Sequence, residues 1–118
     1  MLLLGLTLVA AASLAASAPA HGGKLWFGTA ANVAGNVKRK YPEATSARCF
    51  ALPPALRTRF NAHSTVHRDT RSWDHLACVV VPTGSDPCVV IAHVTGREWP
   101  SFYLTSFPYR GCTPYQLR

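Results

Sequence analysis

Short apolar runs alternate with turn-forming residues along the chain from residue 24 to residue 107. No segment shows a sustained apolar stripe at helical spacing, and the nine prolines oppose long helices. Several short strands separated by Gly, Pro and Asp at roughly even intervals are typical of an all-β sandwich or barrel. We therefore predict an all-β fold. The predicted strands are Lys24–Phe27, Ala47–Leu52, Leu76–Val81, Cys88–Val94 and Ser101–Phe107.

The first twenty residues differ from the rest because they carry no charged side chain. The apolar stretch Leu2–Val9 runs into small residues, and Ala18-Pro19-Ala20 offers signal peptidase a cleavage site before His21. A membrane anchor is the alternative, since about 20 apolar residues can span a bilayer. However, Ala, Ser and Pro dilute the second half, and no basic cluster follows at once. We predict a signal peptide over residues 1–20 and one secreted, extracellular domain over residues 21–118.

The four cysteines all lie in the predicted mature part. An even number in a short exported chain predicts two disulfides, and composition alone allows three pairings. Two of the predicted strands, Leu76–Val81 and Cys88–Val94, are rich in valine and are separated by the turn-forming residues 82–87. Folding them as a hairpin brings Cys78 and Cys88 into facing positions. That leaves Cys49 for Cys112. We therefore predict the bridges Cys78–Cys88 and Cys49–Cys112.

The mature part is strongly basic, with twelve Lys and Arg against five Asp and Glu and a formal net charge of +7. Such a protein is attracted to anionic partners, among them phosphate, nucleic acid, acidic glycans and membrane lipid, although the same charge also keeps a secreted protein soluble. The triplet Lys38-Arg39-Lys40 has two interpretations, a dibasic processing site or a solvated surface segment. We favour the solvated segment.

The order and spacing of several segments along the chain resemble those of the βγ-crystallin-like small secreted proteins found among fungi and microbial killer toxins. The resemblance covers residues 24–112 and implies two four-stranded Greek keys packed as a sandwich. Its second Greek key would start at the hairpin that carries Cys78 and Cys88. The remaining segments that carry it are Trp26–Gly35, Cys49–Pro53, Asn61–Val66, Trp99–Phe107 and the closing Cys112.

The chain departs from this family at the calcium sites. Calcium-binding members begin each box with two Asn or Asp residues, whereas this chain has Phe60-Asn61 in the first box and Ser101-Phe102 in the second. Calcium needs six to eight oxygen ligands, and carboxylates raise the affinity. We therefore expect no calcium, no other metal and no cofactor. By the resemblance, Ser64 and Ser106 would form hydrogen bonds across each Greek key.

Residues 57–75 hold the densest group of reactive side chains. Two histidines and an arginine or lysine can act as general base, general acid and phosphate stabiliser, which is the chemistry of a secreted ribonuclease. Nothing in the sequence places two imidazoles on opposite sides of a phosphate, so solvated loop residues are the favoured interpretation. The group comprises Arg57, Arg59, His63, His67, Arg68, Asp69, Arg71, Asp74 and His75.

Two further arrangements in this segment are weaker. His63 and His67 could share a metal ion only on a helix, because four residues along a strand span roughly 13 Å. Ser72, Asp74 and His75 supply the residue types of a hydrolase triad, but the Gly-x-Ser-x-Gly nucleophile turn is absent from the sequence.

Arginine and tryptophan supply two candidate ligand sites. Clustered arginines can bind phosphate or carboxylate through their planar guanidinium groups, so a possible anionic-ligand patch is predicted. Its members are Arg48, Arg57, Arg59, Arg68 and Arg71. Trp26, Trp73 and Trp99 could stack on sugars, although a small β domain also needs large side chains in its core.

We predict a non-enzymatic protein that acts outside the producing cell. It would be a toxin, an antimicrobial or a host-directed effector, attracted first to the anionic surface, membrane lipid or glycan of a target cell. The first alternative is a secreted ribonuclease-like enzyme that uses His63, His67 or His75 with an arginine. The second is a cell-wall carbohydrate-binding module that uses exposed Trp26 and Trp99.

Overall fold

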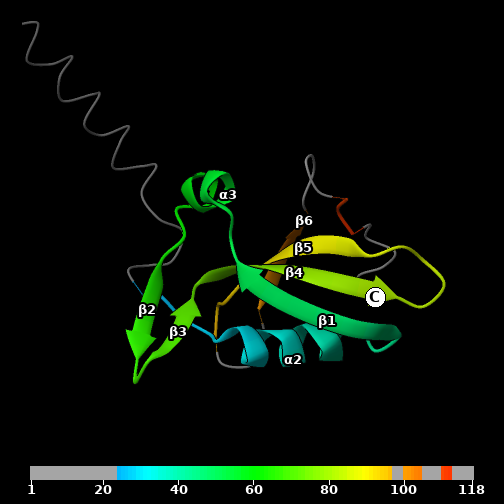
Figure 1. Ribbon diagram of the computed structural model, residues 1–118, viewed down its shortest axis with the longest axis horizontal. Helices are drawn as coiled ribbons and strands as arrows, with labels where there is room; N and C mark the ends of the chain where they lie inside the picture. Colours follow the sequence, from blue (N-terminus) through cyan, green and yellow to red (C-terminus); the bar gives the residue numbers. More distant parts are fainter. Residues whose placement is uncertain (1–23, 97–99, 105–109, 113–118) are drawn as a thin grey trace, which may run out of the picture.

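A computed structural model of the protein describes residues 24–96, 100–104 and 110–112 (Figure 1). The predicted signal peptide, residues 1–20, lies outside the described residues, and so do Trp99 and Ser106. Helices and strands are mixed along the described chain. In chain order they are α2 (Ala30–Lys40), β1 (Ala44–Ala51), α3 (Pro54–Arg59), β2 (Ser64–His67), β3 (Thr70–Trp73), β4 (His75–Pro82), β5 (Cys88–His93) and β6 (Ser101–Leu104).

Four strands form one antiparallel sheet in the order β1-β4-β5-β6. Each of these strands pairs with the next of the four along the chain, so the sheet is a meander. The segment between β1 and β4 contains α3 and an antiparallel two-stranded ribbon, β2-β3. Figure 1 shows α3 and this ribbon at one end of the sheet.

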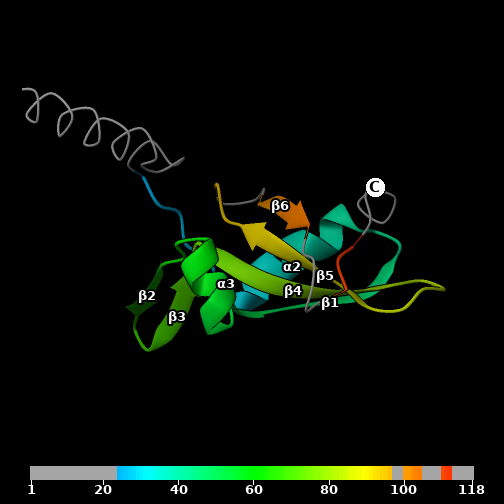
Figure 2. The same ribbon diagram turned by 90° about the horizontal axis from the view of Figure 1, so that it is seen from above.

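Helix α2 lies along one face of the sheet, and the hydrophobic core fills the space between them (Figures 1 and 2). On β4 the side chains of Leu76, Cys78 and Val80 are fully buried in this core, as expected for alternate residues that point to one face of a strand. From the helix, Val33 and Val37 complete the contact.

Local signals explain where α2 begins and ends. The hydroxyl of Thr29 accepts a hydrogen bond from the backbone N–H of Asn32 at 3.2 Å, which caps the first turn. The basic triplet Lys38-Arg39-Lys40 forms the last turn, where positive charge complements the helix dipole. Tyr41 is the C-cap, and the proline that follows it, Pro42, cannot continue the helix.

The prediction of a chain without sustained helix is wrong for residues 30–40. The large core-facing side chains of α2 are those of Val33, Val37 and the capping Tyr41, spaced four apart, and Ala30 and Ala34 pack against the same core. The remaining helix positions are small or polar, so the apolar stripe is narrow and its helical period is faint. Lys24–Phe27 is likewise not a strand, and only the next residue, Gly28, makes an isolated bridge, with Trp73.

Both disulfides exist, but the predicted pairing is wrong: Cys49 is joined to Cys78, and Cys88 to Cys112. The register of the sheet explains this. Cys49 lies directly opposite Cys78 in the β1–β4 pair, with the two Cα atoms 4.0 Å apart. In the β4–β5 pair, Cys78 faces Val90 and Cys88 faces Val80, so these two cysteines are two positions out of register.

The fold prediction is confirmed at its coarser level. The structure is mostly β, with antiparallel sheets and two disulfides. The two Greek keys are not confirmed, because the described strands form a four-stranded meander and a two-stranded ribbon. In the part of the chain that the structure describes, no helix is both long and apolar enough to cross a membrane.

Candidate functional site

Asp74 is the centre of a buried polar cluster at the end of the sheet where β3 passes into β4. Its side chain is fully buried. Oδ1 accepts a hydrogen bond of 2.6 Å from the backbone N–H of His63, and Oδ2 lies 3.0 Å from Nδ1 of the same residue. Nδ1 of His75 lies 3.2 Å from Oδ1. One carboxylate therefore holds two imidazole rings.

The backbone keeps this carboxylate in place. The N–H of Asp74 donates to the carbonyl of His63 at 3.2 Å, and its carbonyl accepts from the N–H of Val94 at 2.7 Å. Burial by itself would raise the pKa of Asp74. Hydrogen bonds from the backbone and ring of His63, and the contact with the His75 ring, outweigh it and hold this pKa below its ordinary value of 3.8.

The contact with Asp74 also determines which nitrogen of the neutral His63 ring carries the proton. A carboxylate at Nδ1 favours the tautomer that carries its proton on Nδ1, so the lone pair of the neutral ring is on Nε2. The His63 side chain is 43% exposed, whereas that of Asp74 is fully buried. His63 is therefore an oriented imidazole with solvent access, which is the arrangement of a general base.

His75 belongs to a stack of rings on the sheet face opposite α2. It is the register partner of His93, and the two rings are stacked with centroids 4.2 Å apart and an interplanar angle of 2°. The hydroxyl of Tyr103, on β6, lies 3.3 Å from Nδ1 of His93. Phe60, at the C-cap of α3, is 5.6 Å from both the His75 and the Tyr103 rings. These contacts bury the His75 side chain, which is 5% exposed.

Two arginines join the two histidines around one pocket with a volume of about 90 Å³. Arg57 comes from α3 and Arg71 from β3, so the inserted segment brings cations to the end of the sheet. The guanidinium of Arg57 donates to the carbonyl of Leu52 at 3.4 Å. The pocket is lined by Ala51, Leu52, Arg57, Ala62, His63, Ser64, Arg71, Trp73 and His75.

The other predicted site residues lie elsewhere. Arg48 is on β1 with its guanidinium over the ring of Phe50, and Arg59 lies over Phe60. Arg68 is in the β2–β3 turn with φ of 50°. His67 ends β2, so a strand rather than a helix separates it from His63. No group of three or more His, Cys, Asp or Glu within the described ranges is arranged to hold a metal ion.

Sequence reasoning missed the role of Asp74 and did not include His93 or Tyr103. The sequence grouped Asp74 with Ser72 and His75 in a hydrolase pattern, whereas in the structure it contacts His63 as well as His75. His93 ends a valine-rich run and pairs with the first residue of the preceding strand. A histidine at each outer end of a predicted hairpin was the signal that could have brought these two together.

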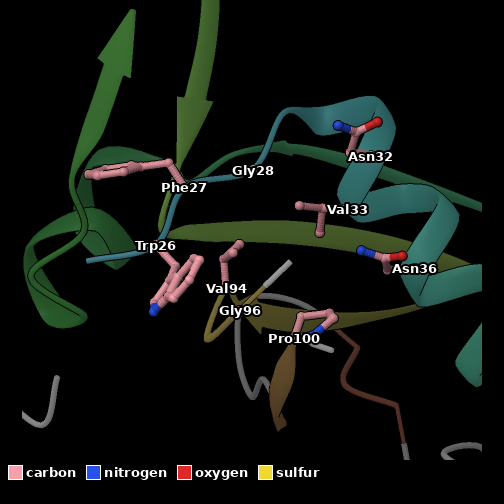
Figure 3. Close-up of a pocket in the computed structure, with 9 residues that line it drawn as sticks. All are labelled: Trp26, Phe27, Gly28, Asn32, Val33, Asn36, Val94, Gly96 and Pro100. Atoms are coloured by element: carbon pink, nitrogen blue, oxygen red, sulfur yellow. The ribbon is translucent and has the colours of Figure 1, made fainter. Parts of the chain in front are cut away.

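A second, larger cavity lies beside α2 (Figure 3). Its volume is about 270 Å³, and Trp26 borders it from the segment before the helix. Asn32 and Asn36 border it from the helix, and Val94 from the end of β5. The remaining lining residues are Phe27, Gly28, Val33, Gly96 and Pro100.

No protein-family model, curated protein or solved structure matches the chain.

Proposed function

We propose that the chain is an exported, basic, ribonuclease-like protein whose site is the pocket of His63, His75, Arg57 and Arg71. The observation that carries this proposal is the sharing of one buried carboxylate, Asp74, by two imidazoles that line the same pocket as two arginines. Cleavage of RNA needs a base, an acid and cationic groups for the phosphate, and the pocket contains residues of all three kinds.

The shared carboxylate supports a division of labour between the histidines. One carboxylate neutralises one imidazolium. The proposal assigns the base to one ring and the acid to the other, and both rings contact the same carboxylate. Such a pair holds an acid and a base at the same time.

The proposed reaction uses these two forms. The neutral ring of His63 accepts the proton of the ribose 2′-hydroxyl through Nε2, and the 2′-oxygen attacks the adjacent phosphorus. The bond from phosphorus to the 5′-oxygen breaks, and the imidazolium of His75 gives its proton to that oxygen. Arg57 and Arg71 stabilise the charge on the non-bridging oxygens. The products are a 2′,3′-cyclic phosphate and a free 5′-hydroxyl.

Charge and disulfides are consistent with this role. A net charge of +7 favours association with a polyanion such as RNA. Two disulfides in a small protein are consistent with an extracellular location. Action as a toxin, antimicrobial or host-directed effector would follow from RNA cleavage outside the producing cell. The βγ-crystallin-like resemblance stays a prediction, and this proposal does not depend on it.

Cleavage assays with the disulfide-bonded protein test the proposal. We expect cleavage of an RNA oligonucleotide with 2′,3′-cyclic ends and no cleavage of the DNA of the same sequence, which lacks the attacking hydroxyl. His63→Ala should lower the rate about 10²–10⁴-fold, the usual contribution of a general base. The matched control is His67→Ala, which removes an exposed histidine from the end of β2 and should leave the rate unchanged.

Two outcomes would contradict the enzymatic proposal. The first is the absence of RNA cleavage, and the second is cleavage that His63→Ala does not reduce.

A second candidate function is non-enzymatic attraction to an anionic surface, which is favoured by Arg48 and the 45% exposed Phe50 side by side on β1. Growth inhibition of target cells that survives His63→Ala but is lost on Arg48→Ala would support that candidate.

A further inference from the structure

The cavity beside α2 differs in chemistry from the histidine pocket. Among the described residues that line it there is no Lys, Arg, His, Asp or Glu. Two cations contact residues of this lining: the Lys24 ammonium lies over the Trp26 ring, and Arg39 donates a hydrogen bond to Oδ1 of Asn36. Both are engaged by the lining itself, so the described lining favours a neutral ligand over a phosphate or carboxylate. The polar side chains among the described lining residues are the two carboxamides of Asn32 and Asn36 and the indole N–H of Trp26. These groups suit a neutral ligand that both donates and accepts hydrogen bonds.

The size of the cavity limits that ligand to about one ring. A volume of 270 Å³ holds about nine waters at about 30 Å³ each. This lies just below the range that starts at about 300 Å³ for sites of drug-sized molecules. Trp26 supplies a large flat apolar surface at one side of the cavity, with Val94 close to it (Figure 3). The Lys24 ammonium lies 4.2 Å from the centroid of the Trp26 ring and helps to hold it.

The two carboxamides stand one helical turn apart on the same side of α2. Side chains at positions i and i+4 have Cβ atoms about 5–6 Å apart. Figure 3 shows Asn36 extending from α2 across from Trp26 and Val94. Arg39 donates a hydrogen bond to Oδ1 of Asn36, which orients this carboxamide. The pair therefore presents two polar groups separated by the width of a ring.

We propose that this cavity binds one neutral hexopyranose unit of a β-linked glycan, of the glucose or N-acetylglucosamine type. Such a sugar has equatorial hydroxyls around its edge and an apolar face of C–H groups, which packs on an indole. Hydroxyls on opposite sides of the ring reach Asn32 and Asn36. A nucleobase fits less well, because the specific contact of a base with Asn uses adjacent atoms of one edge and a single carboxamide.

The test is an NMR titration of the whole disulfide-bonded protein with cellobiose and with N,N′-diacetylchitobiose. We expect saturable shifts of the Trp26 indole N–H and of the Asn32 and Asn36 side-chain amides, with a dissociation constant on the order of 1 mM. Asn32→Ala and Asn36→Ala should each weaken binding about fivefold, the effect of one lost hydrogen bond. The control Ser46→Ala removes an exposed hydroxyl of β1 and should change nothing.

Trp26 packs partly against the core, so removing its whole side chain could unfold the protein. The variant Trp26→Phe keeps an aromatic ring and should weaken sugar binding without unfolding the protein. Absence of shifts with both disaccharides overturns the proposal. Shifts of the same three groups by adenosine or uridine, without any by the disaccharides, also overturn it and assign a base-binding site instead. The proposal is independent of RNA cleavage: His63→Ala should leave sugar binding intact, and Asn32→Ala should leave cleavage intact.

Discussion

At the scale of the residue, Asp74 links stability to pH. Its pKa is lower in the folded protein than its ordinary value of 3.8, because hydrogen bonds from the His63 backbone and from imidazole outweigh the effect of burial. A carboxyl with a depressed folded-state pKa binds protons more readily in the unfolded chain. Its stabilising contribution is therefore complete above about pH 4 and is lost as the pH falls through the folded pKa.

We expect Asp74→Asn to reduce the free energy of unfolding at pH 7 by about 1–3 kcal/mol, because the His63 contacts lose their charged acceptor. The difference from the parent should shrink between pH 4 and pH 2, where the parent loses the same charge. Urea unfolding at pH 7, 4 and 2.5 measures both effects. Asp69→Asn is the matched control, since Asp69 is exposed in the β2–β3 turn with φ of 64°, which Asn tolerates. A difference that stays constant down to pH 2.5 would show that the charge of Asp74 is irrelevant.

At the scale of the element, a glycine just before α2 and a glycine in the middle of it should respond in opposite directions to the same substitution. A Cβ at Gly35 would meet no atom within 4 Å, so Gly35→Ala should stabilise the protein by about 0.5–1 kcal/mol through helix propensity. A Cβ at Gly28 would lie 2.7 Å from Cγ2 of the buried Val33. Gly28→Ala should therefore destabilise the protein by about 1–3 kcal/mol through overpacking. Urea unfolding measures both changes, and shifts of the same sign would refute the described packing of α2.

The same element shows how far the sequence could predict the fold. Strands β4 and β5 were predictable because valine-rich runs stand on both sides of a clear turn. Helix α2 was not, because its only large apolar side chains are Val33, Val37 and the capping Tyr41, and its stability depends on the sheet that it covers. The site was half predictable. His63, His75, Arg57 and Arg71 lie in one segment of the sequence, but the contacts of the two histidines with Asp74 and the meeting of all four residues around one pocket depend on tertiary structure. The register of β1 and β4, which decides the Cys49–Cys78 bridge, is likewise not visible in the sequence.

At the scale of the whole molecule, the two disulfides hold different parts together although they close loops of similar length. The bridges join residues separated by 29 and 24 positions, so each should contribute about 3.5 kcal/mol by loop entropy. Cys49–Cys78 links two strands that the β1–β4 ladder already joins. Cys88–Cys112 instead attaches residues 110–112, whose backbone contacts with β5 include Val89 N–H to the Arg110 carbonyl at 2.7 Å and Cys112 N–H to the Val89 carbonyl at 3.2 Å.

This difference predicts distinct local consequences for the two paired substitutions. We expect each double variant to lower the free energy of unfolding by about 3.5 kcal/mol. The first combines Cys49→Ala with Cys78→Ala, and the second combines Cys88→Ala with Cys112→Ala. Only the second pair should speed hydrogen exchange of the Val89 amide beyond the change in global stability, because the segment that accepts its hydrogen bond is released locally. Native-state hydrogen exchange, with the amide of Val80 in the sheet core as the internal reference, measures this. Equal changes at Val89 in the two variants would mean that residues 110–112 unfold only with the whole domain.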